Sequence, residues 1–311
     1  MNRSIIPEMR TGAESPMMNV KQSTEERGPE IGSDYWDLEI KPQSSLFNLH
    51  LKDVWNYRDL LWLLVRRDFV SFYKQTVLGP LWFFIQPIFT TIIFTVIFSR
   101  LARIPTEGAP PALFYLAGTV AWNYFSECLT RTSGVLRDNS AIFGKVYFPR
   151  LIMPLSNVIS SLVKFGVQLL LFVLMIAWYL FNGYDLHPNI YILLFPVILL
   201  MMAMLGLGIG LIVSALTVKY RDLAFLVSFA VQLLMYATPI IYPLSFVPEK
   251  YKPIIALNPL VALIETFRFG FIGTGQFYSG ALLYSVIASV VLFVAGIVIF
   301  NKVEKNFVDT V

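Results

Sequence analysis

Charged residues are scarce in this chain. They make up 14% of its 311 residues, whereas hydrophobic residues make up 56%. Soluble domains carry roughly 25% charged residues, so this composition excludes an ordinary soluble domain and predicts an integral membrane protein. The single cysteine, Cys128, excludes a disulfide framework and a cysteine metal cluster. The two histidines, His50 and His187, lie far apart in the sequence, so we expect no metal site.

Nucleotide-binding motifs are also missing. No Gly-x-x-x-x-Gly-Lys-Ser/Thr pattern occurs, so we expect a transport subunit rather than an enzyme, with no cofactor of its own. If ATP drives transport, ATP and Mg belong to a separate partner subunit. Gly206, Gly208 and Gly210 superficially resemble a dinucleotide fingerprint, but they lie in an apolar run with no preceding strand. Close packing of helices through small residues explains them better.

Long apolar runs dominate what remains. They are continuous, unlike the roughly ten-residue alternating segments of a membrane β-barrel, and therefore predict helices. We predict an all-α integral membrane protein with six transmembrane helices, near residues 80–101, 112–131, 155–181, 190–217, 223–242 and 279–300. Most lysines and arginines lie at the helix ends that this topology places on the same side of the membrane as the N-terminus. Because loops rich in Lys and Arg face the cytoplasm, we expect both termini there.

The stretch between the last two spans is interrupted by prolines. Asn258-Pro259 then opens an apolar run of only about 13 residues, which is too short to cross a membrane. Asparagine is a favoured N-cap and proline a favoured first helical residue. Backbone that enters a membrane without crossing it needs a protein or water-filled surrounding. We therefore predict re-entrant helices over 243–275 on the far side of the membrane, carrying Glu265 and Arg268, and hence a transport path.

The N-terminal part divides into two regions. Residues 1–53 form a cytoplasmic segment, in which we expect disorder over 1–33 and a short hairpin over 34–51. Residues 54–76 form an amphipathic helix at the membrane interface. Its predicted apolar face carries Leu61, Val65, Phe69 and Phe72, and its polar face carries Arg67, Ser71 and Lys74. The transmembrane domain covers 77–302, and 303–311 is a cytoplasmic tail.

Two ionisable residues, Glu127 and Lys164, lie within apolar runs. Such residues are candidate functional sites, but each also lies close enough to a helix end for its charge to reach the cytoplasmic surface. Aromatic residues are dense, and most such residues form interface belts or pack between helices. Alternatively, some face a pore and stack against sugar rings; the candidates are Trp82, Phe83, Tyr115, Trp122 and Tyr124.

From about residue 50 to its end, the chain resembles the permease subunit of ABC-2 type polysaccharide exporters, which serve O-antigen, capsule and teichoic acid, and it is closest to the O-antigen type. The order and spacing of several short motifs carry the resemblance. They are Tyr57-Arg58-Asp59-Leu60, Leu78-Gly79-Pro80-Leu81-Trp82, Tyr115-Leu116-Ala117-Gly118, Phe148-Pro149-Arg150, Lys219-Tyr220-Arg221-Asp222 and Asn258-Pro259-Leu260.

The resemblance implies a homodimer in the bacterial inner membrane, paired with two copies of a nucleotide-binding ATPase subunit. It implies export of undecaprenyl-pyrophosphate-linked polysaccharide, and thus a role in lipopolysaccharide biosynthesis. The family's coupling loop maps to 132–150, with Lys145, Phe148, Pro149 and Arg150 as candidates for coupling to the ATPase. Arg66, Arg67 and Lys74 are candidates for binding the lipid pyrophosphate, although contact with anionic membrane lipids explains these cations equally well.

Other classes of protein stay open at this point. An ABC-2 permease for a drug or a small lipid would show the same re-entrant pair. An ion-coupled secondary transporter would need inverted repeats and mid-membrane ionisable groups, of which only Glu127 and Lys164 are candidates. A membrane enzyme acting on sugar lipids would need a carboxylate cluster at a phosphate site, and the acidic residues are scattered.

Overall fold

A computed structural model describes residues 51–74, 78–143, 148–220 and 222–307. Every regular element in these ranges is helical, which confirms the all-α class for the part of the chain that is described. The disorder predicted for 1–33 and the hairpin predicted over 34–51 lie outside the described residues, apart from Leu51.

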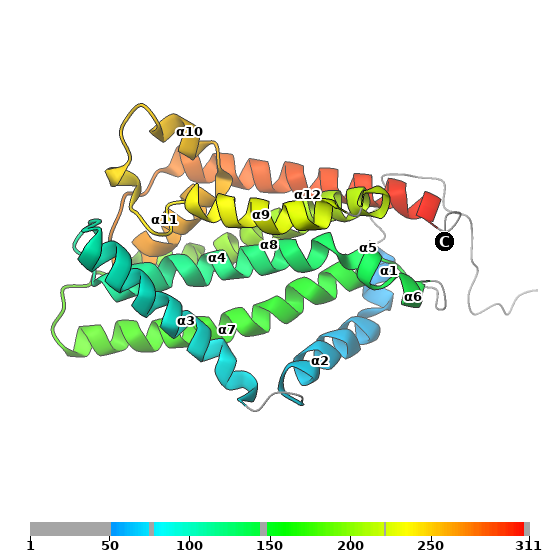
Figure 1. The fold of residues 1–311 in the computed structure, drawn as a ribbon, viewed down its shortest axis with the longest axis horizontal. Coiled ribbons are helices and arrows are strands. Elements are labelled where there is room, and N and C mark those ends of the chain that lie inside the picture. Colours follow the sequence, from blue (N-terminus) through cyan, green and yellow to red (C-terminus); the bar gives the residue numbers. More distant parts are fainter. Residues whose placement is uncertain (1–50, 75–77, 144–147, 221, 308–311) are drawn as a thin grey trace, which may run out of the picture. The chain divides into compact units, whose positions relative to one another are not determined.

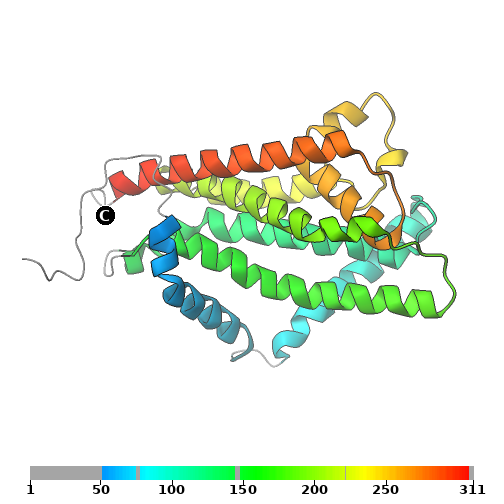
Figure 2. The same ribbon diagram turned by 180° about the vertical axis from the view of Figure 1, so that it is seen from behind.

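Four long helices form the body of the molecule (Figures 1 and 2). They are α4 (Pro111–Ser133), α7 (Ile152–Phe181), α8 (Phe195–Lys219) and α12 (Ser279–Phe307). α4 packs against both α7 and α8, and α8 packs against α12. α4 is the most deeply buried of the four, and its buried side chains supply much of the core.

Glycines allow α8 to pack closely against α4 and α12, as the sequence predicted for the glycines of α8. A Cβ added at Gly206 would lie 2.7 Å from the Cβ of Cys128 on α4. A Cβ at Gly208 would lie 2.6 Å from the carbonyl oxygen of Leu292 on α12, and one at Gly296 would lie 2.4 Å from the Gly208 oxygen. Only residues without a side chain allow the backbones to approach this closely.

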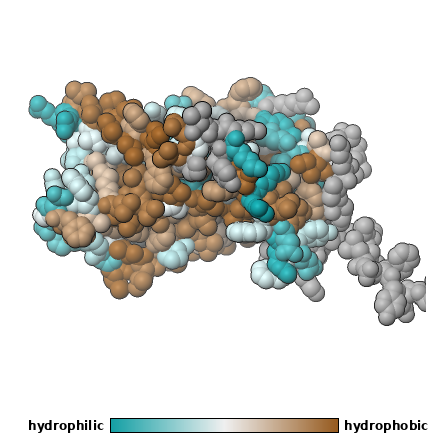
Figure 3. Space-filling view, turned by 90° about the horizontal axis from the view of Figure 1, so that it is seen from below, coloured by the Kyte–Doolittle hydropathy of each residue, from teal (hydrophilic) through white to brown (hydrophobic). Residues whose placement is uncertain are grey.

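Among the residues that the structure describes, four segments are long and apolar enough to cross a membrane: Trp82–Leu101, Ile152–Phe181, Ile190–Lys219 and Ser279–Val303. The first combines α3 (Trp82–Phe94) with a π-helical turn, η2 (Thr95–Leu101), and the third combines η3 (Ile190–Leu194) with α8. α4 is 23 residues long but is not among these four, and α9 (Leu223–Tyr236) is apolar but only 14 residues long. One face of the molecule is hydrophobic along its middle and hydrophilic toward both ends (Figure 3).

The N-terminal helices lie beside this body. α1 (Leu51–Asn56) precedes α2 (Arg58–Lys74), which packs against α7 and is followed by η1 (Gly79–Leu81) and α3. α2 buries Leu64, Val65 and Asp68 and exposes Trp62 and Phe69. Of the predicted apolar face, Val65 is thus buried against the bundle, whereas Phe69 is exposed. The buried Asp68 carboxylate contacts Arg131, whose side chain is 24% exposed.

The two ends of the bundle carry different structures (Figure 1). At one end lie α1 and the short helices α5 (Val135–Asp138) and α6 (Ser140–Phe143). At the other end, α9 leads through η4 (Leu244–Phe246) and α10 (Lys252–Ala256) into α11 (Pro259–Ile272), which precedes α12. The predicted interruption between the last two apolar spans is therefore built from three short helical pieces.

Candidate functional site

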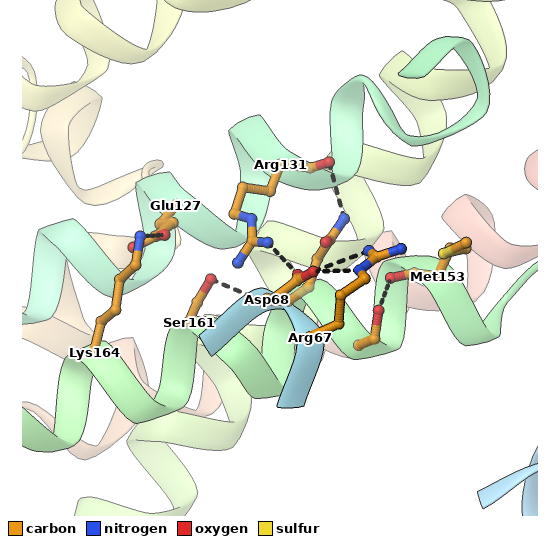
Figure 4. Close-up of polar contacts among 9 residues, drawn as sticks. Arg67, Asp68, Glu127, Arg131, Met153, Ser161 and Lys164 are labelled. Atoms are coloured by element: carbon orange, nitrogen blue, oxygen red, sulfur yellow. Dashed lines mark hydrogen bonds and ion pairs between the residues drawn. The ribbon is translucent and has the colours of Figure 1, made fainter. Parts of the chain in front are cut away.

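A polar cluster joins α2 to the body of the bundle (Figure 4). The Asp68 carboxylate accepts a hydrogen bond from Nη2 of Arg131 on α4 at 2.5 Å and one from Nη2 of Arg67 at 2.9 Å. The Asn157 side chain on α7 donates to the Arg131 carbonyl oxygen at 3.2 Å, so three helices meet here. The Asp68 side chain is only 10% exposed, so removing Arg67 and Arg131 would leave a largely buried charge unpaired.

The three cations proposed from the sequence to bind pyrophosphate are all exposed on α2, but they differ in their surroundings. Arg66 and Lys74 are exposed, whereas the guanidinium of Arg67, with half of its side chain exposed, already contacts Asp68. Arg67 and Lys74 are seven residues apart and thus lie on the same side of the helix, about two turns from each other. The binding of a phosphate group by these residues stays a prediction.

Glu127 and Lys164, which the sequence placed in separate apolar runs, form an ion pair between α4 and α7 (Figure 4). Their side chains are 24% and 17% exposed. The Lys164 ammonium also lies 5.6 Å from the ring centroid of Phe83. We had expected each charge to reach the membrane surface on its own. The pairing arises instead because α4 and α7 are packed neighbours, and it partly neutralises both groups within the bundle.

The predicted coupling loop, 132–150, contains α5 and α6. The Leu136 N–H donates to Oγ of Ser214 on α8 at 3.3 Å, which ties the loop to the bundle. Further along, the Phe148 ring lies 5.7 Å from that of Phe143, and the Arg150 guanidinium lies 5.6 Å from the same Phe143 ring. Phe148 and Arg150 are buried, and Pro149 is partly buried. Lys145 lies outside the described residues.

At the opposite end, α11 begins as the sequence predicted. The Asn258 side chain caps the helix by accepting from the Leu260 N–H at 3.1 Å, and Pro259 takes the first helical position. Nδ2 of Asn258 also donates to the Thr238 hydroxyl at 2.8 Å, which attaches the start of α11 to the end of α9. Capping and attachment are therefore performed by the same side chain.

Arg268 is 1% exposed and forms the centre of a buried network. Its two terminal nitrogens each donate to a backbone carbonyl oxygen at 2.6 Å, those of Pro239 and Ile240. Nη1 also lies 3.3 Å from Oε1 of Glu265, and the guanidinium lies 3.8 Å from the ring centroid of Phe114. Arg268, which the sequence placed in the re-entrant segment, is thus enclosed by protein, and its side of the membrane stays a prediction.

The aromatic residues proposed to contact glycan fall into two groups. Tyr115, Trp122 and Tyr124 of α4 are at most 4% exposed. They pack against neighbouring rings, for example Tyr124 on Phe165 at 5.1 Å. Trp82 on α3 is 50% exposed. Only α3 thus presents one of the proposed rings openly, and glycan contact stays a prediction for all five residues.

Sequence reasoning missed several residues of these networks. Asp68 and Arg131 are 63 positions apart, and no spacing rule connects them. Glu107, which accepts a hydrogen bond from the hydroxyl of Ser245, 138 positions away, was not predicted either. Within the described ranges, no group of three or more His, Cys, Asp or Glu side chains could hold a metal ion. The predicted absence of a metal or cofactor nevertheless stays a prediction.

Comparison with known proteins places this arrangement among transporters. The family model described as ABC-2 type transporter matches residues 59–272. The chain is 31% identical over 257 residues to the O-antigen export system permease protein RfbA of Klebsiella pneumoniae, covering 81% of this chain and 94% of that protein. It is 29% identical to the RfbA protein of Myxococcus xanthus, covering 84% and 98%. It is 23% identical to the polysialic acid transport protein KpsM of Escherichia coli, covering 66% and 78%.

Proposed function

Because this chain belongs to the ABC-2 type transporter family, we propose that it is the permease subunit of an ABC exporter that moves lipid-linked polysaccharide across the bacterial inner membrane. The observation that carries the proposal is the match to O-antigen export permeases over nearly their whole length. A third relative, named for polysialic acid transport, also handles a polymer of sugars. The substrate we propose is O-antigen or a similar cell-surface glycan on undecaprenyl pyrophosphate.

We propose the following placement in the membrane. The four long apolar segments cross it together with α4 and residues 223–242, in which turns over 237–242 extend the 14-residue α9, which gives six spans. α4 needs less apolar surface because other helices enclose it. α2 lies along the cytoplasmic interface, where exposed Trp62 and the basic residues of the helix suit lipid head groups. Residues 243–275 form the re-entrant pair on the periplasmic side, and both termini face the cytoplasm.

Two copies of this chain and two ATPase subunits make up the proposed transporter. Exposed apolar side chains on α3 and α9 offer a surface for lipid or for a second copy; they include Phe89, Ile92, Phe225 and Phe229. ATP and Mg act on the partner subunits, because no nucleotide-binding motif is present in this sequence. The glycan passes along the surface between the two copies, where the Trp82 ring is exposed and the Phe83 ring is partly buried.

We propose that conformational changes of the ATPase act on this chain through the loop 132–150. We propose that Lys145, Phe148, Pro149 and Arg150 couple this loop to that subunit, with the buried Phe148 and Arg150 acting through their packing rather than by direct contact. Phe148 and Arg150 both pack on Phe143, which ties the residues just before α7 to the end of α6. The hydrogen bond from Leu136 to Ser214 then passes the loop's displacement to α8, the helix at the centre of the bundle. Transport follows as α8 moves together with its packed neighbours.

The pyrophosphate head group enters at α2. Arg66 and Lys74 are exposed cations there, and Arg67 can exchange part of its contact with Asp68 for a phosphate oxygen. Arginine binds phosphate in a bidentate manner that lysine cannot reproduce. Replacing Arg66 and Arg67 by lysine should therefore lower export while insertion into the membrane stays normal. Unchanged export would favour simple attraction to anionic lipids.

Deleting the gene tests the function itself. We expect surface glycan to disappear and lipid-linked glycan to accumulate on the cytoplasmic side, with both effects reversed by the wild-type gene. The measurement is surface staining together with extraction and analysis of lipid-linked sugar. Normal surface glycan in the deletion strain, combined with loss of export of a drug or a small lipid, would contradict the proposal.

A further inference from the structure

A cavity of about 570 Å³ lies at the end of the bundle that carries α10 and α11. α10, α11, the start of α12 and the loop before α4 contribute to its walls. Its volume is in the range of small-molecule sites, which is roughly 300–1,000 Å³. The residues that matter for its chemistry are Glu107, Ser245, Lys252, Glu265, Phe277 and Tyr278.

Two carboxylates of this lining converge on one point. A Cβ added at Gly275 would lie 3.0 Å from Oε2 of Glu265 and 3.5 Å from Oε2 of Glu107. Gly275 has a φ of +93°, a conformation that glycine adopts without strain. The missing side chain therefore leaves space beside both carboxylate oxygens.

Each carboxylate is held in place through its other oxygen. Oε1 of Glu107 accepts a hydrogen bond from the Ser245 hydroxyl. Oε1 of Glu265 faces the Arg268 guanidinium at 3.3 Å, and the Glu265 side chain is only 8% exposed. Two hydrogen-bond acceptors from different loops and helices are thus fixed before any ligand arrives, which lowers the cost of ordering them on binding.

Aromatic rings complete the lining. Phe277 is fixed by neighbouring rings, with its centroid 4.4 Å from that of Tyr191 and 6.2 Å from that of Phe269. Tyr278 is 54% exposed, and its hydroxyl donates to Oε1 of Gln276. A rigid ring and an accessible ring therefore stand in the same cavity as the paired carboxylates.

We propose that this cavity binds one or two neutral sugar rings of the exported glycan, with the Glu107 and Glu265 carboxylates accepting hydrogen bonds from sugar hydroxyls and the Phe277 and Tyr278 rings lining the apolar C–H face. The inference rests on the proposed function and deepens it, because it places a glycan contact at the end of the bundle away from the head-group cations. A lipid chain fits less well, since it would cover both carboxylates with apolar atoms and offer them no further hydrogen-bond donor.

Photocrosslinking of the intact exporter, in cells that display surface glycan, tests the location. A benzophenone amino acid replaces Tyr278, which lines the cavity, or Tyr251, which is 50% exposed nearby but does not line it. We expect glycan on the chain crosslinked at position 278 and at least threefold less at 251. Equal crosslinking at both positions, or crosslinks at 278 only to phospholipid, would overturn the inference. The proposed function would still stand, because these cells export glycan.

Binding of delipidated oligosaccharide, prepared from the surface glycan of the producing cells, tests the chemistry. The purified exporter in nanodiscs is compared with its Glu107→Gln and Tyr278→Ala variants. Replacing a charged acceptor by a neutral one should weaken binding about three- to tenfold. Asp185→Asn is the control, because it removes the same charge from a 93% exposed residue that does not line the cavity. Equal binding by all four proteins, or no binding by any, would overturn the inference.

Discussion

The two ends of the bundle hold their charges in different ways. At the α2 end, Asp68, Arg67 and Arg131 bind one another through side chains, and parts of both arginines reach solvent. At the α11 end, Arg268 is buried and bonds mainly to backbone carbonyl oxygens. Side-chain pairs can exchange partners as helices move, whereas a guanidinium enclosed by carbonyls and an aromatic ring fixes the chain around it. The contacts at the first end therefore permit a change of partners, whereas those at the second end hold one geometry.

Removing Arg268 should have the largest effect. Arg268→Met leaves the Pro239 and Ile240 carbonyls and the Glu265 carboxylate without their partner, which should destabilise the protein by about 3–5 kcal/mol. Arg268→Lys should rescue little, because one ammonium cannot reproduce the planar fork. Thermal unfolding in detergent measures both. Arg100→Met, at an exposed position, is the control. Equal melting temperatures for Arg268→Met and this control would contradict the claim that Arg268 fixes the α11 end of the bundle.

Adding a methyl group against Arg268 and its partners should have the next largest effect on the free energy of unfolding. A Cβ at Gly118 would lie 2.5 Å from Nη2 of Arg268 and 3.0 Å from the Ile240 oxygen. Gly118→Ala should therefore cost about 1–3 kcal/mol of unfolding free energy. Gly166→Ala is matched to it, because it is also a glycine in a long helix but has nothing within 4 Å of the added atom. That control should be neutral or stabilising by about 0.5–1 kcal/mol. A smaller cost at Gly118 than at Gly166 would refute the tight packing.

Releasing α2 should have a more local effect. Asp68→Asn weakens the contacts to Arg67 and Arg131, so we expect faster hydrogen exchange in α2 and an unfolding free energy lower by about 1–3 kcal/mol. Asp59→Asn, at an exposed position of the same helix, provides the control. Exchange that accelerates equally in α2 and α11 would mean that the two ends are not independent, which would contradict the comparison.

Breaking the Glu127–Lys164 pair should have the smallest effect. A double-mutant cycle with Glu127→Gln and Lys164→Met should give a coupling of about 1 kcal/mol, since both side chains are partly exposed. Export should persist in all three variants if the pair only joins α4 and α7. Loss of export in Glu127→Gln with normal stability would instead favour ion-coupled transport.

Local signals in the sequence predicted the local features of this fold. Apolar runs located the long helices, Asn258-Pro259 located the start of α11, and the glycines of α8 located the closest helix packing. Features that depend on distant partners were not predictable. Asp68 faces the bundle because Arg131 lies there, and Glu127 pairs with Lys164 because α4 adjoins α7. Arg268 stood out in the sequence as a charge inside a short apolar helix. The sequence did not indicate which carbonyl oxygens its guanidinium contacts.

Reconstitution tests the central claim most directly. The chain and the ATPase encoded beside it are placed together in vesicles with lipid-linked glycan, and movement of glycan into the lumen is measured. The account predicts transport that requires both proteins and ATP, with hydrolysis stimulated by the glycan lipid. A chain that forms no complex with an ATPase, or that moves its substrate with an ion gradient in place of ATP, would contradict it.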